Sequence, residues 1–190
     1  MVGKIFITRS GYDPQVGKHI KDPYLGPRPT LGACRPDVRR LLQVGDHIFV
    51  ISGRVPDVNQ FVMGGFEIAS KIPATEAYHA FPELRLRRLK DGQLTGNIIV
   101  NSRGEQHALD DHDSFGERIK NYVVGTNLIS VTRPEEIAEG RRQTVEALCD
   151  ILHKTGKTLV ELVGRWGTKL TEEQIIQLRD WMKALKVSVN

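Results

Sequence analysis

Runs of apolar residues in the first two thirds of the chain predict a series of short strands. Residues 4–8 predict a short apolar strand. Residues 47–52 are nearly continuous in β-branched and aromatic side chains, which is the pattern of a strand buried on both faces. Residues 61–68 predict an antiparallel neighbour, in which Gly64 and Gly65 indicate a bulge or a close approach of another backbone. Weaker strand patterns follow at 84–86, 98–100 and 127–131. So many short strands favour a small mixed β-barrel.

The spacing of apolar residues becomes helical towards the C-terminus. Residues 134–156 carry an apolar stripe behind an acidic first turn, and residues 159–163 predict a short helix. Thr171 and Gln174 form a capping-box pattern at the start of a last amphipathic helix. We therefore expect residues 157–190 to form a helical hairpin.

One further helix is predicted at residues 36–43, because Pro36 suits the first helical turn and Gly45 ends the pattern. Together these elements predict an α+β fold. Residues 1–132 are expected to form a small mixed β-barrel with peripheral helices. Residues 133–190 are expected to form a C-terminal helical extension packed on that domain.

Length and composition add an expected location. The 190 residues, 39% of them hydrophobic, are enough for a sizeable core. Cys34 and Cys149 lie far apart and lack the spacing of a zinc site, so neither a disulfide framework nor a structural zinc is expected. The N-terminus has no signal-peptide pattern, and no apolar run approaches about 18 residues. We therefore expect a cytoplasmic protein with no membrane partner.

Positive charge is concentrated in the first half of the chain. Residues 1–90 hold 14 Lys and Arg against 8 Asp and Glu, whereas residues 91–190 hold 13 against 15. Clustered cations can neutralise the phosphates of a nucleic acid, although ordinary solvated surface charge gives the same count. In the run 85–90, Arg85 and Arg87 would share one face of a strand. They would then either follow a phosphate backbone or protect an edge strand from aggregation.

Residues 10–34 hold so many glycines and prolines that they predict a long structured loop. Loops of this length are uncommon unless they are functional or disordered. Aromatic rings on such a loop can stack on a base, and arginines can contact phosphate or a guanine edge. The alternative is a surface loop wrapped over the barrel. The candidate binding residues of the loop are Tyr12, Tyr24, Arg28, Thr30 and Arg35.

Two sequence motifs resemble one known family. Residues 23–53, PYLGPRPTLGACRPDVRRLLQVGDHIFVISG, resemble the nucleotide-modification-associated domains, particularly the second type, in the order of a Thr-Leu, a Cys followed by Arg-Pro, and Val-Gly-Asp. Residues 108–116 are similar to the family's later apolar-acidic-Phe-Gly motif, and residues 66–68 suit its intervening strand. The resemblance covers roughly residues 5–130 and leaves the C-terminal helices unmatched.

The resemblance implies both a fold and a function. This family is thought to belong with the PUA-like barrels, alongside the EVE, YTH and ASCH domains, which hold modified or flipped bases in a pocket. A nucleic-acid-binding module is therefore expected, with DNA favoured over RNA or a free nucleotide, recognising a modified base in DNA modification or defence. Both tryptophans, Trp166 and Trp181, lie outside the match, so a tryptophan cage is not expected.

The hypothesis assigns roles to particular side chains. Tyr12 or Tyr24 would stack on the base, and Asp46 or Asp113 would accept hydrogen bonds from its edge. Cations around the pocket would hold the phosphates. The predicted phosphate contacts are Arg28, Arg35, Arg39, Arg40, Arg85 and Arg87.

Two other classes of function remain open. Cys34 lies at a helix start whose dipole would lower the pKa of its thiol, and His19 or His47 could serve as the base. This would suit an ASCH-like hydrolase or a Cys34-dependent transferase that modifies a base or nucleotide, although a packed thiol is the commoner case. The other class is a protein-interaction module whose C-terminal helices supply the interface.

The run from His107 to Asp113 contains imidazoles and carboxylates, which suit divalent transition metals. Its spacing does not match a known metal-binding pattern, and a solvated acidic turn is the favoured interpretation. No metal and no cofactor is therefore predicted.

Overall fold

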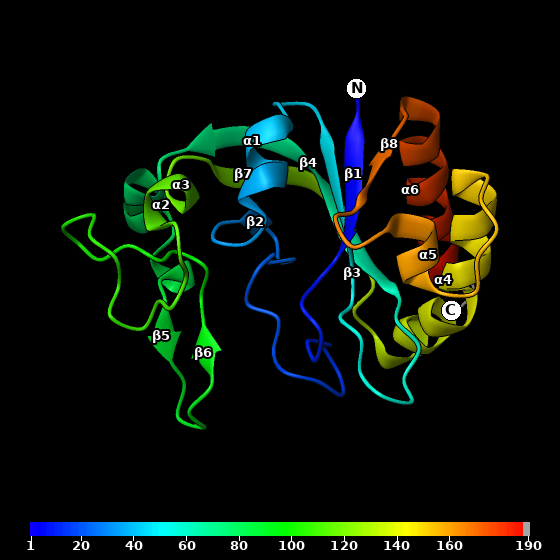
Figure 1. The fold of residues 1–190 in the computed structure, drawn as a ribbon, viewed down its shortest axis with the longest axis horizontal. Coiled ribbons are helices and arrows are strands. Elements are labelled where there is room, and N and C mark those ends of the chain that lie inside the picture. Colours follow the sequence, from blue (N-terminus) through cyan, green and yellow to red (C-terminus); the bar gives the residue numbers. More distant parts are fainter. Residues whose placement is uncertain (188–190) are drawn as a thin grey trace. The chain divides into compact units, whose positions relative to one another are not determined.

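The fold is mixed α+β in the computed structural model, which describes residues 1–187 (Figure 1). The strands are β1 (Gly3–Ile7), β2 (Thr30–Leu31), β3 (His47–Ile51), β4 (Val62–Ile72), β5 (Arg87–Arg88), β6 (Leu94–Thr95), β7 (Tyr122–Ser130) and β8 (Thr168–Leu170). The helices are α1 (Pro36–Leu41), α2 (Ala74–Ala80), the 3-10 turn η1 (Pro82–Leu84), α3 (Phe115–Arg118), α4 (Pro134–Leu152), α5 (Leu159–Val163) and α6 (Glu172–Val187). The predicted α+β class is thus confirmed.

Six strands form one sheet in the order β2-β7-β4-β3-β1-β8, and β5 and β6 form a separate two-stranded sheet. β1 pairs in parallel with β3, and β3 pairs antiparallel with β4. The register slips by one residue between the pairs Val50↔Gly64 and Ile51↔Val62. A Cβ atom on Gly65 would lie 2.8 Å from the backbone carbonyl oxygen of Ile48 and 2.3 Å from the Phe49 ring. Both the bulge and the close approach predicted from the glycine pair are therefore confirmed.

The contacts between residues divide the chain into two compact units. Unit 1 comprises residues 1–18, 45–67 and 127–190, and unit 2 comprises residues 19–44 and 68–126. The C-terminal helices therefore share a unit with β1 and β3. β4 and β7 each supply residues to both units.

In unit 1, β1 lies between β3 and β8, and the helices α4, α5 and α6 pack together beside β1 and β8 (Figure 1). The capping box of Thr171 and Gln174 is confirmed, because each backbone N–H donates to the other side chain. The predicted helical hairpin is wrong at residues 168–170, which form β8 and pair antiparallel with β1. Among residues 1–187, no helix is both long and apolar enough to cross a membrane.

Unit 2 is organised around two groups of buried side chains. The larger group joins α2 and η1 to the extended segment 98–100 and to β7, and the smaller one joins Leu86 to Ala33 and Ile99. Residues 98–100 make isolated bridges rather than the predicted strand, since Ile98 pairs with Arg85 and Val100 with Gln106. The members of the larger group are Ala74, Ala77, Phe81, Leu84, Ile98, Val100 and Tyr122.

Candidate nucleic-acid interface

A short antiparallel hairpin carries three exposed cations of unit 2, Arg87, Arg88 and Lys90. β5 and β6 pair in the register Arg87↔Thr95 and Arg88↔Leu94. The N–H of Leu89 donates to the carbonyl of Gln93 at 2.7 Å, and Gly92 has a φ of +85°, which closes the turn. Residues 87–93 are all exposed. The hairpin therefore presents backbone and side chains on both faces of a two-stranded ribbon.

The base of this hairpin is held by an arginine that stacks on an aromatic ring. The guanidinium of Arg85 lies 4.0 Å from the centre of the Tyr78 ring, and its Nε donates to the Tyr78 carbonyl at 2.9 Å. The adjacent Leu86 is buried. Arg85 therefore anchors the hairpin. Arg87, which was predicted to contact phosphates together with Arg85, is exposed.

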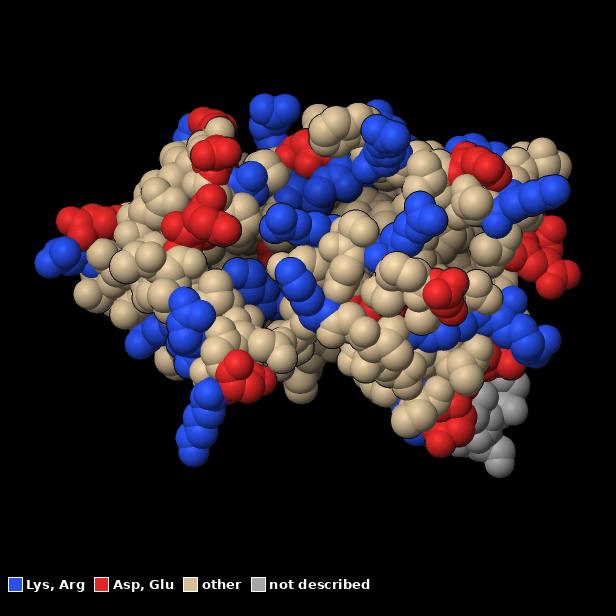
Figure 2. All heavy atoms as spheres, turned by 60° about the horizontal axis from the view of Figure 1, so that its bottom comes forward, with Lys and Arg blue, Asp and Glu red and all other residues tan. Residues whose placement is uncertain are grey.

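The hairpin is strongly basic on its outer part. Four of the six residues from 85 to 90 are Arg or Lys, and Arg88 and Lys90 are exposed together with Arg87. Successive residues of a strand point to opposite faces, so Arg87 and Arg88 put a cation on each face of the ribbon. Figure 2 shows Lys and Arg atoms spread over this face of the surface, with Asp and Glu atoms between them.

The Gly/Pro-rich loop of unit 2 is fixed by one buried carboxylate. Asp22 is 7% exposed, and its oxygens accept from the backbone N–H groups of Gly32, Ala33 and Cys34. Asn97 Nδ2 donates to the same carboxylate at 2.9 Å. The carboxylate therefore satisfies four donors at once.

The network continues through the side chains of Asn97, Thr30 and Tyr122. Of these three residues, Thr30 was predicted to bind a ligand. Asn97 also donates to the hydroxyl of Thr30 at 2.9 Å and accepts from the Tyr122 hydroxyl at 2.7 Å. Burial raises the pKa of Tyr122, so this phenol stays protonated and donates. Thr30 is fully buried in this network. The Thr30 hydroxyl, which was predicted to bind a ligand, is therefore part of the core.

Arg39 is a correction to the predicted phosphate contacts. Its side chain is 0% exposed and donates to the carbonyls of Ala33, Cys34, Arg118 and Asn121 at 2.8–3.3 Å. A guanidinium that is enclosed and bonded in this way cannot reach a phosphate. Arg39 is a structural residue, and the adjacent Arg40, which is exposed, is the cation of α1 that faces solvent.

The other predicted residues of the loop differ in their accessibility. The ring of Tyr24 is half-buried and lies over Gly26, where a Cβ atom would come within 2.2 Å of it. Arg28 is exposed and lies 4.1 Å above the Phe81 ring. Arg35 is paired with Asp37 at 2.7 Å, and its side chain is 16% exposed. Of these, Arg28 is the most available for an anion.

Tyr12 and Asp46 belong to unit 1, whereas the other predicted binding residues belong to unit 2. Asp46 Oδ1 accepts from the N–H of Val2 at 3.0 Å. Tyr12 forms an isolated bridge with Lys18, and its carbonyl accepts from Gly53. Both residues therefore help to hold backbone segments of unit 1 together.

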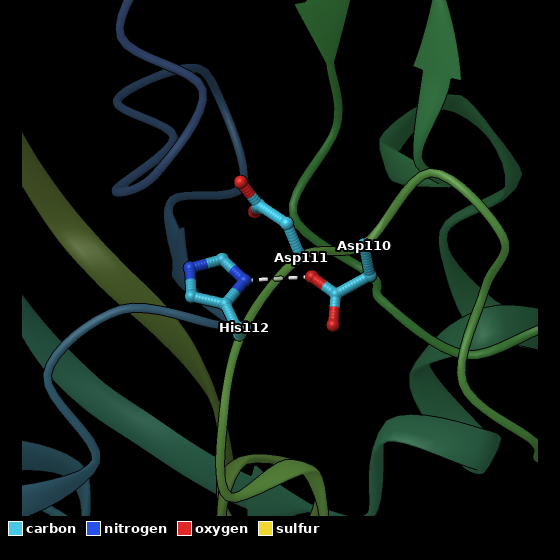
Figure 3. A group of neighbouring side chains, drawn as sticks. All are labelled: Asp110, Asp111 and His112. Carbon is cyan, nitrogen blue, oxygen red and sulfur yellow. Dashed lines mark hydrogen bonds and ion pairs between the residues drawn. The ribbon is translucent and has the colours of Figure 1, made fainter.

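The acidic turn of unit 2 brings three potential metal ligands together. Asp110, Asp111 and His112 each have one ligand atom within 4.8 Å of the others. Figure 3 shows the imidazole of His112 facing the carboxylate of Asp110, with 2.6 Å between Nδ1 and Oδ1. Gln106 donates to the other oxygen of Asp110 at 2.9 Å. This group could hold a divalent cation, and the exposed Asp113 lies beside it in sequence.

Cys34 has the opposite electrostatic setting from the one that a nucleophile needs. Burial, and after it the Asp22 carboxylate, raises the pKa of the thiol to about 12. The expected lowering by the helix start is therefore wrong, because desolvation and a nearby negative charge both penalise the thiolate. His19, the proposed base, is exposed.

We predict that Cys34 resists alkylation by iodoacetamide at pH 7.5 in the folded chain and reacts on unfolding, as followed by peptide mass spectrometry. Because its pKa in the folded state lies above the ordinary value of 9.0, its contribution to stability is complete below pH 9. The free energy of unfolding should fall as the pH rises from 9 towards 12. Cys149, in unit 1, is the internal comparison. Alkylation of Cys34 in the folded state at the rate of a free thiol would contradict the assignment.

The prediction missed two features of unit 2, and the sequence held a signal for only one of them. Asp91-Gly92 is a strong hairpin signal, and it would have placed Arg88 and Lys90 beside Arg87. Nothing in the sequence linked Asp22 to Asn97, which lie 75 positions apart. The resemblance to nucleotide-modification-associated domains rests on its motifs alone. Comparison of the chain with models of protein families, with curated proteins and with solved structures found no match.

Proposed function

We propose that this chain binds duplex DNA and that the β5–β6 hairpin is the element that enters the DNA. The observation that carries the proposal is an exposed two-stranded ribbon with Arg87 and Arg88 on opposite faces and Lys90 at its tip. A groove is bounded by a phosphate backbone on each side. Cations on both faces of a ribbon are therefore suited to a groove, whereas an edge strand protected from aggregation needs no such distribution.

The dimensions of the ribbon favour the major groove of DNA. From residue 86 to residue 90 the extended chain spans roughly 13 Å, at about 3.3 Å per residue. The major groove is about 12 Å wide and 8.5 Å deep and admits a two-stranded ribbon. The major groove of duplex RNA is too deep and narrow for side chains to enter. DNA is for this reason the favoured partner.

The proposal that the DNA carries a modified base rests on the family resemblance. In that part of the proposal, the PUA-like fold supplies a base-binding site in unit 2. Arg28 would contact the phosphates, and Tyr24 or Asp113 would contact the base. The hairpin fixes the orientation of the duplex, as phosphate contacts do in general. The Cys34-dependent transferase is the less favoured alternative, because burial raises the pKa of the Cys34 thiol to about 12 and so disfavours the thiolate at neutral pH.

The proposal is tested by fluorescence anisotropy with a labelled duplex of about 20 base pairs. Arg87→Ala combined with Arg88→Ala is expected to weaken binding roughly ten- to a hundredfold at 0.1 M salt, since two charged contacts are lost. The plot of log affinity against log salt should become shallower by about 2. Running the titration with and without 5-methylcytosine in the duplex tests the modified base separately.

The matched control removes two other exposed cations of unit 2. Arg103 pairs with Glu105, and Lys120 pairs with Glu117, both outside the hairpin. Arg103→Ala combined with Lys120→Ala changes the net charge equally and is expected to leave affinity within about twofold. Equal losses in the two double variants would show that only net charge matters, and the hairpin assignment would fail.

A further inference from the structure

Unit 1 contains a buried histidine whose imidazole is not fully hydrogen-bonded. His47, the first residue of β3, is 5% exposed. Its Nδ1 atom is buried and has no hydrogen-bond partner within residues 1–187. The ring stacks on that of Phe49, with 6.3 Å between the two centres. An imidazolium carries an N–H on both ring nitrogens, so protonation would bring a charge and a further donor to a place that offers Nδ1 no acceptor.

The register of the sheet turns this imidazole towards α6. His47 lies opposite Gly3 of β1 and opposite Glu67 of β4, and residues paired in this way point to the same face of a sheet. A Cβ atom on Gly3 would lie 3.0 Å from the side chain of Ile175, so this face of β1 is covered by α6. Arg179 follows Ile175 by four positions and therefore lies on the same side of the helix.

The groups around the imidazole oppose its protonation on balance. Burial, and after it the guanidinium of Arg179, lowers the pKa of His47. The carboxylates of Glu67 and Asp46 and the carbonyl of Gly45 act in the other direction, but they do not compensate for the burial. The imidazole is therefore neutral at neutral pH in the folded chain.

The charges that face His47 are held in place by bonds between different elements. Arg179 Nη1 donates to the carbonyl of Asn127 in β7 at 2.9 Å, and Asn127 Nδ2 donates to Glu67 at 2.8 Å. At the start of β1, the N-terminal ammonium of Met1 pairs with Glu172 of α6 at 3.8 Å. The guanidinium is thus fixed to the sheet, and α6 carries it there.

We propose that His47 is an acid-sensitive latch that holds α6 on the sheet at neutral pH and releases it on acidification. The neutral ring packs under α6. Once the ring takes a proton, the enclosed charge and the repulsion from Arg179 are both relieved when α6 moves away and water reaches the imidazole. All of these residues belong to unit 1, so the latch is separate from the hairpin of unit 2.

The latch is tested by amide hydrogen exchange of α6 at about pH 7.5 and about pH 5, with the intrinsic effect of pH on exchange removed. A pKa of His47 below the ordinary 6.5 means that the folded state binds fewer protons than the open one. Its stabilising effect is therefore complete above about pH 7 and is lost as the pH falls below 6.5. Protection of α6 should fall roughly tenfold in the unaltered chain, since one proton changes the equilibrium by at most about tenfold per pH unit.

Variants at three positions give the effect a sign. His47→Gln should remove most of the acid-dependent loss of protection. Arg179→Met should lessen the loss, because the repulsion is gone, whereas Glu67→Gln should increase it, because the imidazolium loses a counter-charge. The matched control is His153→Asn, since His153 is exposed at the end of α4 with a φ of +51°, which asparagine tolerates. This control should lose as much protection as the unaltered chain.

The inference has an outcome even where His47→Gln does not fold. In the unaltered chain, the NMR signal of the His47 ring should titrate below pH 6.5, in step with the loss of α6 protection. A ring that titrates at or above pH 6.5, or a loss in His47→Gln equal to that of the unaltered chain, would overturn the latch. The Arg87→Ala and Arg88→Ala variant should keep the full acid response, so the result does not depend on whether the hairpin binds DNA.

Discussion

Replacing Asp22 with alanine is expected to destabilise unit 2 by about 4 kcal/mol or more, the largest effect of any single substitution proposed. Three consecutive backbone N–H groups and the amide of Asn97 donate to this carboxylate. Each buried donor left without a partner costs about 1–3 kcal/mol. The backbone of Asn97 lies close to Gly32, since a Cβ atom there would lie 2.5 Å from the Asn97 carbonyl oxygen. Urea unfolding followed by circular dichroism measures the loss.

The control for this prediction is Asp37→Ala. Asp37 pairs with Arg35, and its side chain is 37% exposed. A partly exposed pair contributes at most about 1 kcal/mol, so the loss should be small. Asp22→Asn should stand between the two, because the amide keeps the shape but turns one acceptor into a donor facing backbone N–H groups. A loss below about 1 kcal/mol for Asp22→Ala would contradict the role given to the network.

Replacing Arg39 with methionine is expected to cost about 3–5 kcal/mol of unfolding free energy. Methionine retains the aliphatic part of the side chain but removes the guanidinium that donates to four carbonyl groups, of which that of Ala33 keeps a second donor, Nη1 of Arg118. Asp22 and Arg39 act on the same segment from opposite sides, because the carboxylate binds the N–H groups of Ala33 and Cys34 and the guanidinium binds their carbonyls. The double variant should therefore lose less than the sum of the two single losses.

Arg40→Met is the matched control, since Arg40 is the exposed neighbour of Arg39 on α1. It is expected to change the free energy of unfolding by less than about 0.5 kcal/mol. Equal effects at the two positions would show that burial of Arg39 does not contribute, and the phosphate contact first predicted for Arg39 would again be open. Thermal unfolding monitored by circular dichroism separates the two variants.

Much of the fold follows from local patterns in the sequence. The continuous apolar run 47–52 predicted β3, and the capping box at Thr171 predicted the start of α6, because burial on both faces and capping both act within a few residues. β8 was missed because three residues between two helices carry too little periodicity to be recognised. The pairing of Leu170 with Gly3 fixes this strand, and that contact is not local.

The candidate sites show the same difference between local and distant causes. The basic character of residues 85–90 is visible in the sequence, and the Asp91-Gly92 turn makes a hairpin of it. Arg39 and Arg40 cannot be told apart by type or by neighbours. Only the arrangement of carbonyls from residues 33, 34, 118 and 121 shows that the first is enclosed and the second is free to face solvent.

The most direct measurement is the affinity of the intact chain for a duplex DNA and for a duplex RNA of the same sequence. Each affinity is measured at several salt concentrations between about 0.05 and 0.2 M, because binding through phosphate contacts weakens strongly over this range. We predict tighter binding to DNA than to RNA and an affinity that falls steeply with salt. The Arg87→Ala and Arg88→Ala variant should lose that preference. Equal affinity for the two duplexes, or no salt-dependent binding of either, would contradict the proposal that the hairpin enters the major groove of DNA.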